Sequence, residues 1–146
     1  MKIFGYGTFI TSGIYQNFEN VRAAYLPGYL RVLRPTDPFP YVLKDDSNTP
    51  PKGFWGLVFE VTPDQLVDLD YYEGSLYERI QVECMYNDRR KEFITIYYPT
   101  KRSIKYYKLT EYIVDFDPWQ EKIKTDHPEI VEEFPELVWD HPPNNH

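Results

Sequence analysis

The sequence has 146 residues, of which 42% are hydrophobic and 18% aromatic, so it is long and apolar enough to bury a core and lacks a disordered composition. Its net charge of −7 argues against nucleic acid as the main partner, and its single cysteine excludes an internal disulfide and a cysteine-rich zinc site. No apolar run resembles a signal peptide or approaches the roughly 20 residues of a membrane helix, so we expect a cytoplasmic protein of one domain with no membrane partner.

The negative charge is concentrated near the C-terminus. Between Glu111 and Asp140 there are ten acids and two lysines, whereas residues 1–110 carry 13 acids and 14 bases. The character of the chain also changes after Pro99, where the strand-like segments end, so we expect residues 1–99 to form the main structural unit. Residues 100–146 should form an acidic C-terminal extension whose charges lie on a solvated helical surface.

The chain begins with a predicted short strand, residues 2–6, that runs into a glycine loop. The loop consists of Gly5, Tyr6, Gly7, Thr8, Phe9 and Ile10. Its two glycines allow backbone angles that other residues resist, and a strand that enters such a loop can present several N–H groups to an anion. The same pattern is also typical of a plain turn.

Five further segments have the aromatic, β-branched or alternating pattern of strands. They are residues 29–33, 39–43, 53–61, 77–86 and 92–98. The last two flank a polar turn at residues 87–90 and predict a β-hairpin. Residues 17–24 favour a short helix or turn instead, and on this pattern alone the fold class is α+β.

Two segments carry the signature of a helix start. Thr62 can cap a helix with Pro63 in the first position and Gln65 completing a capping box, and Gly74 can end that helix. Glu73 then lies at the helix C-terminus, where the helix dipole disfavours a negative charge and raises the pKa of the carboxyl group. Asp117 with Pro118 repeats the cap and proline, and residues 105–116 also have helical character.

Most catalytic chemistries are disfavoured by the position of the residues that would perform them. The histidines, His127, His141 and His146, all lie in the acidic segment, and Cys84 lies inside a strand pattern where a buried, inert thiol is usual. We therefore expect no metal and no nucleotide or other cofactor. The remaining candidates are Asp70 and Glu73, which share a helix face, although both could be ordinary surface acids.

Several short motifs occur in a fixed order between residues 2 and 98. They are Gly5-Tyr6-Gly7-Thr8-Phe9, Pro27-Gly28-Tyr29, Phe39-Pro40-Tyr41, Gly56-Leu57-Val58-Phe59-Glu60-Val61, Leu69-Asp70-Tyr71-Tyr72-Glu73-Gly74, Tyr77-Glu78-Arg79 and Tyr97-Tyr98. In this order and spacing they resemble the gamma-glutamylcyclotransferase-like family. Phe9 departs from the family pattern, which usually has leucine there, and the segment after Pro99 has no counterpart in these motifs.

The resemblance implies a small mixed β-barrel with packed helices, here followed by a helical C-terminal extension. It also implies cyclisation of a small γ-glutamyl amine or peptide to 5-oxoproline, with Glu73 as general acid and base and the substrate's own amine as nucleophile. The implied substrate-binding residues are Tyr6, Gly7, Thr8, Phe9, Ile10, Tyr77, Arg79 and Tyr98. Tyr97 is the alternative to Tyr98, and Arg79 could equally be a structural partner of Asp70. Two alternatives are a binding module without turnover and another carboxylate-assisted amide-cleaving enzyme.

Overall fold

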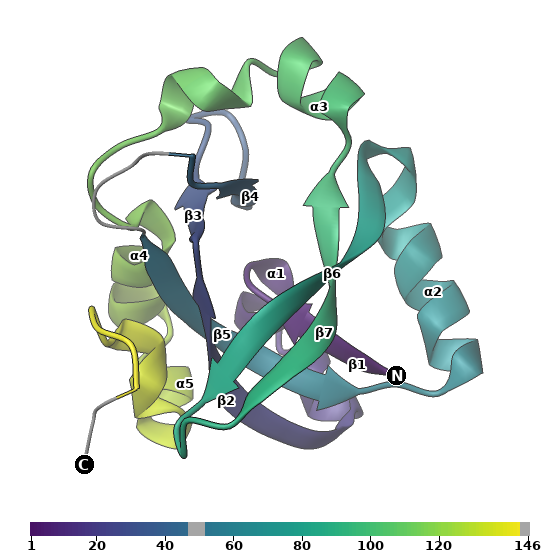
Figure 1. Cartoon of the computed structure of the whole chain (residues 1–146), viewed down its shortest axis with the longest axis vertical. Coiled ribbons are helices and arrows are strands. Elements are labelled where there is room, and N and C mark those ends of the chain that lie inside the picture. Colours follow the sequence, from purple (N-terminus) through teal and green to yellow (C-terminus); the bar gives the residue numbers. More distant parts are fainter. Residues whose placement is uncertain (47–51, 144–146) are drawn as a thin grey trace.

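A closed barrel of five strands forms the centre of the protein (Figure 1). The structure is a computed structural model that describes residues 1–46 and 52–143, and within them the strand order around the barrel is β1–β5–β2–β6–β7. The barrel strands are β1 (Lys2–Gly5), β2 (Glu19–Pro27), β5 (Gly53–Glu60), β6 (Tyr77–Tyr86) and β7 (Lys91–Pro99). Strand β1 is antiparallel to β5 and parallel to β7, so the barrel mixes strand directions and confirms the predicted fold class.

A separate two-stranded ribbon is formed by β3 (Tyr29–Val32) and β4 (Tyr41–Lys44). The turn between β2 and β3 is made by Gly28, whose φ of 82° lies in the left-handed region that glycine adopts readily. Pro40, just before β4, lies against Gly7, just after β1. The ribbon therefore reaches the loop in which the first strand ends.

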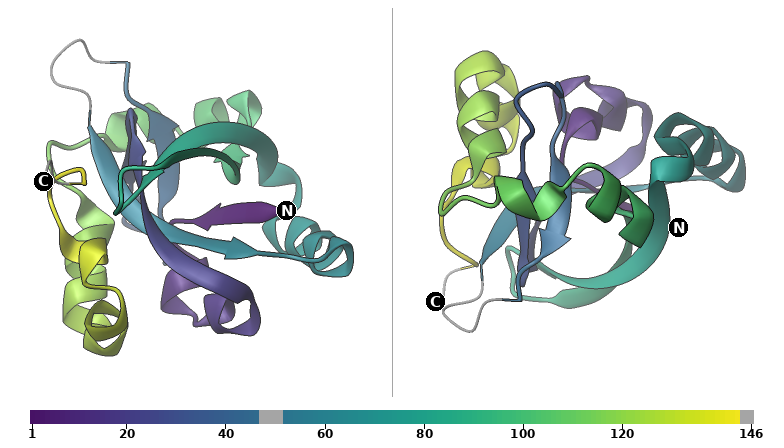
Figure 2. Two further views of the ribbon diagram at one scale, coloured as in Figure 1. Left: turned by 60° about the horizontal axis from the view of Figure 1, so that its bottom comes forward. Right: turned by 90° about the horizontal axis from the view of Figure 1, so that it is seen from above.

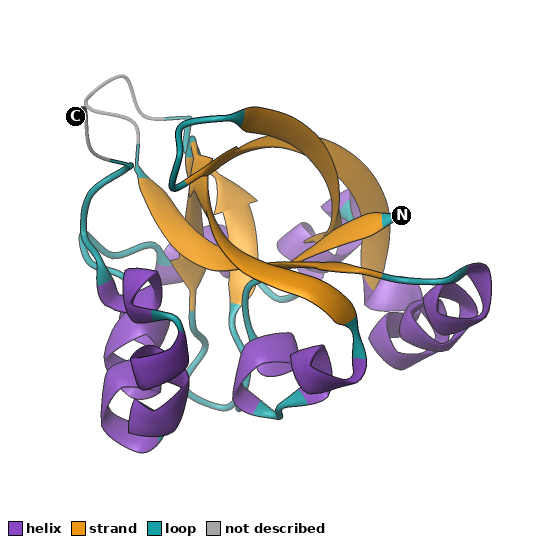
Figure 3. Cartoon of the chain, turned by 90° about the horizontal axis from the view of Figure 1, so that it is seen from below, coloured by secondary structure: helices purple, strands orange, loops and turns teal. Residues whose placement is uncertain are grey.

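Helices surround the barrel on several sides (Figure 3). Within the described residues they are α1 (Thr8–Thr11), α2 (Pro63–Glu73), α3 (Lys101–Tyr106), α4 (Pro118–Asp126) and α5 (Pro128–Glu133), with short 3-10 turns at Ile14–Asn17, Gly74–Leu76, Leu109–Tyr112 and Pro135–Val138. Helix α2 lies on one side of the barrel, and α4 and α5 lie together on the other (Figures 1 and 2). None of the helices in this part of the chain is both long and apolar enough to cross a bilayer.

Both faces of the central strand β5 are buried. Phe54 and Val58 belong to a cluster inside the barrel, whereas Trp55, Leu57 and Phe59 belong to a second cluster shared with the helices. Side chains alternate between the two faces of a strand, which explains the division. Because full burial of such a side chain contributes about 1.5–3 kcal/mol, the outer helices and the barrel stabilise one another.

The local signals around α2 and the hairpin are confirmed. Thr62 Oγ1 accepts from the Gln65 N–H at 3.2 Å, and Gln65 Oε1 accepts from the Thr62 N–H at 2.8 Å. Gly74 follows the helix with a φ of 73°. Strands β6 and β7 pair as the predicted antiparallel hairpin.

The prediction of a short helix or turn at residues 17–24 is wrong. A 3-10 turn ends at Asn17, and β2 then pairs with β5, placing Ala23 opposite Leu57. The register shifts between Glu19 and Arg22, which marks a bulge. Pairing with the most apolar strand of the chain outweighed the weak local propensity of this segment.

The helix predicted at residues 105–116 lies earlier in the chain. Thr100 caps α3 by accepting from the Ser103 N–H at 3.1 Å, so the helix begins at Lys101. It ends after Tyr106, and Lys108 then adopts a left-handed φ of 53°. Only a 3-10 turn follows before α4.

The C-terminal segment packs onto the barrel through one face. Trp119, Ile123 and Leu137 are at most 1% exposed. Trp55 donates from Nε1 to the carbonyl oxygen of His141 at 2.8 Å. The acids of α4 and α5 are exposed. The expected solvated surface is therefore the outer half of a segment whose inner half extends the core.

Candidate active site

The C-terminal turn of α2 is fixed against the barrel and presents Glu73. Leu69 is buried in the core, and Tyr97 of β7 donates from its hydroxyl to Asp70 Oδ1 at 2.6 Å. Glu73 is the last residue of the helix, and Gly74 turns the chain toward β6. The carboxyl group therefore sits on a rigid element and not on a free loop.

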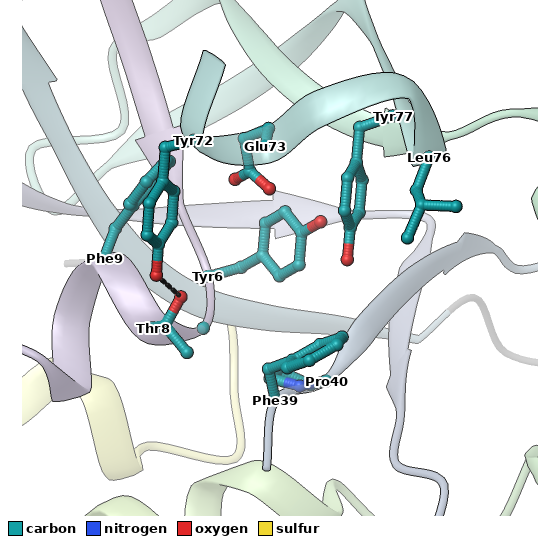
Figure 4. Close-up of a pocket in the computed structure, with 10 residues that line it drawn as sticks. Tyr6, Thr8, Phe9, Phe39, Pro40, Tyr72, Glu73, Leu76 and Tyr77 are labelled. Carbon is teal, nitrogen blue, oxygen red and sulfur yellow. Dashed lines mark hydrogen bonds between the residues drawn. The ribbon is translucent and has the colours of Figure 1, made fainter. Parts of the chain in front are cut away.

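A pocket of about 230 Å³ lies at this helix end (Figure 4). Its walls come from the β1–α1 loop, the segment before β4 and the turn between α2 and β6. The lining residues are Tyr6, Gly7, Thr8, Phe9, Phe39, Pro40, Tyr72, Glu73, Leu76 and Tyr77. Figure 4 shows the Glu73 carboxyl group and the Tyr6 and Tyr77 hydroxyl groups around a common space.

The β1–α1 loop supplies N–H groups beside the pocket. A Cβ added at Gly7 would lie 2.9 Å from Pro40 Cδ, so a side chain at this position would push into the proline ring. The first N–H groups of a helix have no acceptor within it. Those of Gly7, Thr8 and Phe9 donate to no acceptor in residues 1–46 and 52–143. The close packing at Gly7 thus keeps an N–H-rich backbone against the pocket.

Glu73 is the one carboxylate among the residues that line the pocket. Burial raises its pKa to about 7. The charged form loses hydration there, and no cation or hydrogen-bond donor of the described chain compensates it. A carboxyl group in this condition exchanges a proton near neutral pH.

Two tyrosines beside Glu73 stay protonated. Tyr6 is 7% exposed and donates from its hydroxyl to the carbonyl oxygen of Tyr97 at 2.7 Å. Tyr77 stacks on Tyr41 with ring centres 6.0 Å apart. Burial raises the pKa of both Tyr6 and Tyr77 well above the usual value, and the Glu73 charge raises each further. They are neutral hydroxyl groups throughout the range in which Glu73 titrates.

Tyr72 bounds the pocket on the solvent side. Tyr72 is 54% exposed, and the centre of its ring lies 5.9 Å from that of Phe9. Its hydroxyl oxygen lies 3.3 Å from Thr8 Oγ1, within hydrogen-bonding distance. This contact joins α2 to the β1–α1 loop across the edge of the pocket.

Five of the eight predicted binding residues, Tyr6 to Phe9 and Tyr77, line the pocket, and three lie elsewhere. Ile10 is fully buried in the core. Arg79 is paired with Asp70 at 3.4 Å, the structural alternative considered for it. The Tyr98 hydroxyl accepts from the Lys44 N–H at 2.9 Å. Tyr98 and Tyr97 are neighbours in β7 and face opposite sides, and Tyr97 is the one beside α2.

Four pocket residues were absent from the predicted binding set. They are Phe39, Pro40, Tyr72 and Leu76. Phe39, Pro40 and Tyr72 belong to the family motifs, and Leu76 lies three residues after Glu73. Proximity to a motif was therefore the available signal, but the orientation of each side chain depends on the tertiary packing.

Other chemistries would use a metal ion, the thiol of Cys84 or one of the histidines. No group of three or more histidine, cysteine or acidic side chains there could hold a metal ion. Cys84 is fully buried, and burial raises the pKa of its thiol to about 12. His127 and His141 lie in the C-terminal segment, and His146 is outside the described residues.

The family model of gamma-glutamyl cyclotransferase, AIG2-like proteins matches residues 3–121. The chain therefore belongs to this family. The match extends past Pro99 and includes α3 and the beginning of α4, so the family relationship covers more of the chain than the short motifs indicated.

Solved structures share the fold at low sequence identity. An Arabidopsis thaliana protein known from a solution structure is 21% identical with a TM-score of 0.63, and the similarity covers 90% of this chain and 86% of that one. An AIG2-like protein from Mus musculus is 16% identical, with a TM-score of 0.57 and coverage of 81% and 90%. A protein named gamma-glutamyl cyclotransferase is 17% identical, with a TM-score of 0.54 and coverage of 84% and 85%. A search of curated protein sequences found no match.

Proposed function

We propose that this protein cyclises a γ-glutamyl amine or peptide to 5-oxoproline and releases the amine, with Glu73 as general acid and base. The observation that carries the proposal is the unpaired Glu73 carboxyl group in the pocket, whose pKa is raised to about 7. Such a group can both accept and return a proton at neutral pH. A site that only binds an anion or an amide has no need of it.

The proposed reaction uses the substrate's own nitrogen as nucleophile. The Glu73 carboxylate takes one proton from the α-ammonium group, and the freed lone pair attacks the γ-carbonyl carbon. A five-membered ring closes through the new C–N bond, and the carbonyl oxygen becomes an oxyanion. Glu73 then protonates the leaving nitrogen, whose bond to carbon breaks as the carbonyl re-forms. Glu73 takes the surplus proton of the ring nitrogen, and this proton departs with the amine as ammonium.

The remaining pocket residues would hold the substrate in a curled conformation. Ring closure is intramolecular, so correct positioning supplies much of the rate. The free N–H groups of Gly7, Thr8 and Phe9 are suitable donors to the oxyanion and to the α-carboxylate. Tyr6 and Tyr77 provide neutral hydroxyl groups and apolar ring faces on either side.

Two other functions predict different products from the same pocket. An amide hydrolase would use water as nucleophile and release glutamate. A binding module would be stabilised by a γ-glutamyl compound without consuming it.

The test is a panel of γ-glutamyl amines, amino acids and peptides incubated with the purified protein. We expect 5-oxoproline and free amine in equal amounts from at least one of them. The matched control is the same compound acetylated on its α-nitrogen, which removes the nucleophile but leaves the amide bond intact. Cleavage of the acetylated compound would indicate hydrolysis, and stabilisation without any release would indicate a binding module. Either result would overturn the proposal.

A further inference from the structure

Arg31 is a buried cation at the base of the β1–α1 loop. It is 2% exposed, and its guanidinium carbon lies 4.4 Å from the centre of the Phe54 ring. Alternation along β3 turns Leu30 and Val32 toward a cluster under the Leu109–Tyr112 turn and turns Arg31 toward the opposite face. A buried charge is tolerated only with partners that neutralise it and accept its hydrogen bonds.

The Arg31 guanidinium joins two distant segments. Its Nε donates to both carboxylate oxygens of Asp117 at 3.1 Å, and Nη2 donates to the same carboxylate. Its Nη1 donates to the carbonyl oxygen of Tyr6 at 2.8 Å. Asp117 is fixed in turn because it caps α4, accepting from the N–H groups of Trp119 and Gln120 at 3.1 and 3.3 Å.

The bond to the Tyr6 carbonyl has a consequence for the next residue. The Tyr6 C=O and the Gly7 N–H belong to one planar peptide unit, and no cis peptide bond occurs in the described chain. In a trans peptide the two groups point in opposite directions. By holding the carbonyl, Arg31 fixes the plane of this peptide and directs the Gly7 N–H away from itself. A charged donor on the carbonyl also polarises the peptide and strengthens its N–H as a donor.

The β3–β4 ribbon holds this peptide from a second direction. Arg31 pairs with Val42 across the ribbon, and Pro40 lies two residues before Val42. Pro40 packs against Gly7, where an added Cβ would be 2.9 Å away. Gly7 and Pro40 line the pocket, whereas Arg31 does not. The carbonyl side of the peptide is thus on the Arg31 side, and Gly7 is on the pocket side.

We propose that Arg31, held by Asp117, is a positioning residue that aims the Gly7 N–H at the oxyanion formed during ring closure. This inference rests on the proposed cyclotransferase function. It assigns a role at the pocket to the C-terminal segment, because Asp117 is supplied by the start of α4. Neither residue lines the pocket.

A kinetic test compares Arg31→Lys and Asp117→Asn with the wild type. Lysine keeps the positive charge but lacks the planar guanidinium group, which donates to Asp117 and to the Tyr6 carbonyl at the same time. We expect kcat for 5-oxoproline release to fall about 100-fold, with KM within about threefold, because the oxyanion exists only at and near the transition state. Asp117→Asn keeps an oxygen for the helix cap but weakens the hydrogen bonds that hold Arg31, so kcat should fall about tenfold.

The matched control is Arg22→Lys. Arg22 also lies over an aromatic ring, 4.0 Å from the centre of Tyr86, but it belongs to β2 and pairs with Asp88 at 3.8 Å. Its kcat should change by less than about twofold. Unchanged kcat per folded molecule in both Arg31→Lys and Asp117→Asn would overturn the proposal, even if both proteins were less stable, because the pair would then be a structural support only.

Chemical rescue separates positioning from a general loss of packing. In Arg31→Ala, low-millimolar guanidinium should restore kcat, whereas methylammonium at the same concentration should not, because it lacks the fork. If Arg31→Ala does not fold, Asp117→Asn decides the question by the kinetic test. Restoration by both ions to the same extent would contradict the proposed geometry.

A second measurement does not depend on turnover. The Gly7 amide resonance in nitrogen-15 spectra should shift in Arg31→Lys and Asp117→Asn, while the Thr62 amide at the start of α2 should not. If no γ-glutamyl compound is cyclised by the wild type, the proposed function fails but this measurement still tests the link between Arg31 and the Gly7 peptide. An unchanged Gly7 resonance in both variants would overturn the inference.

Discussion

Two acids at helix ends, Glu73 and Asp117, have opposite surroundings. Glu73 ends α2 and faces the pocket without a partner in the described residues. Asp117 caps the start of α4 and accepts hydrogen bonds from Arg31 and two backbone N–H groups. The helix dipole opposes a negative charge at Glu73 and favours one at Asp117. The comparison indicates that burial raises the pKa of an acid that has no partner, as at Glu73, whereas donors hold an acid in position, as at Asp117. Asp117 is held in place by these donors, whereas Glu73, whose pKa is raised to about 7, is free to exchange its proton.

The largest effect on activity is expected for Glu73→Gln. The amide has the size of the carboxyl group but cannot carry a proton between two nitrogens, so kcat for 5-oxoproline release should fall about 1,000-fold, within the range of general acid–base catalysis. Circular dichroism should show a retained fold. The control is Asp68→Asn, an exposed acid on the same helix. A Glu73→Gln protein with near wild-type kcat would show that the proton carrier lies elsewhere.

Asp117→Ala should act on stability. It leaves the buried Arg31 guanidinium without its counter-charge and removes the cap of α4, so the free energy of unfolding should fall by about 3–5 kcal/mol. Urea unfolding monitored by tryptophan fluorescence measures this, since Trp119 lies in the first turn of α4. Asp115→Ala, two residues earlier and exposed, should cost less than about 0.5 kcal/mol. Equal stability of the two variants would mean that the buried ion pair contributes little.

Much of the fold could be predicted because its signals are local. The capping box at Thr62, the glycine after Glu73 and the turn at residues 87–90 each act over a few residues, and all three occur as expected. The segment at residues 17–24 could not be predicted in this way. Its strand conformation depends on pairing with β5, more than 30 residues later, where Ala23 lies opposite Leu57.

The candidate site likewise has one part that local sequence signals predict and another that depends on long-range packing. Glu73 could be singled out because few chemistries remained and a family motif surrounds it. The choice between Tyr97 and Tyr98 required the face of β7, which a motif does not specify, and the tyrosine beside α2 is Tyr97. The pairing of Arg31 with Asp117 joins positions 86 residues apart, and no local sequence pattern around either residue predicts it.

The stability of the wild type should depend on the ionisation of Glu73. Its folded-state pKa of about 7 lies above the ordinary 4.5, so the folded state binds more protons between these values and the free energy of unfolding falls as pH rises through this window. Glu73→Gln does not titrate. It should therefore match the wild type near pH 4.5 and exceed it by about 2 kcal/mol at pH 8, after allowing for partial exposure of the carboxyl group.

Thermal or urea unfolding of both proteins across this range measures the difference. Asp68→Asn, the exposed acid on the same helix, is the control and should change the free energy of unfolding by less than about 0.5 kcal/mol across the range. A Glu73→Gln protein no more stable than the wild type at pH 8 would indicate that the Glu73 carboxylate is well solvated when charged.

The smallest free-energy change is expected in the dependence of the wild-type kcat/KM on pH. The proposed reaction begins with ionised Glu73 and a substrate ammonium group, so below a pH of about 7 the value should fall tenfold per pH unit, equivalent to about 1.4 kcal/mol. Leu76→Ala would admit water to the pocket wall. The fall in kcat/KM should then begin at a lower pH, because burial is what raises the pKa of Glu73. Val67→Ala, on the exposed face of α2, should leave the pH at which kcat/KM falls unchanged. If Leu76→Ala and Val67→Ala gave the same profile as the wild type, the titrating group would not be the carboxyl group in this pocket.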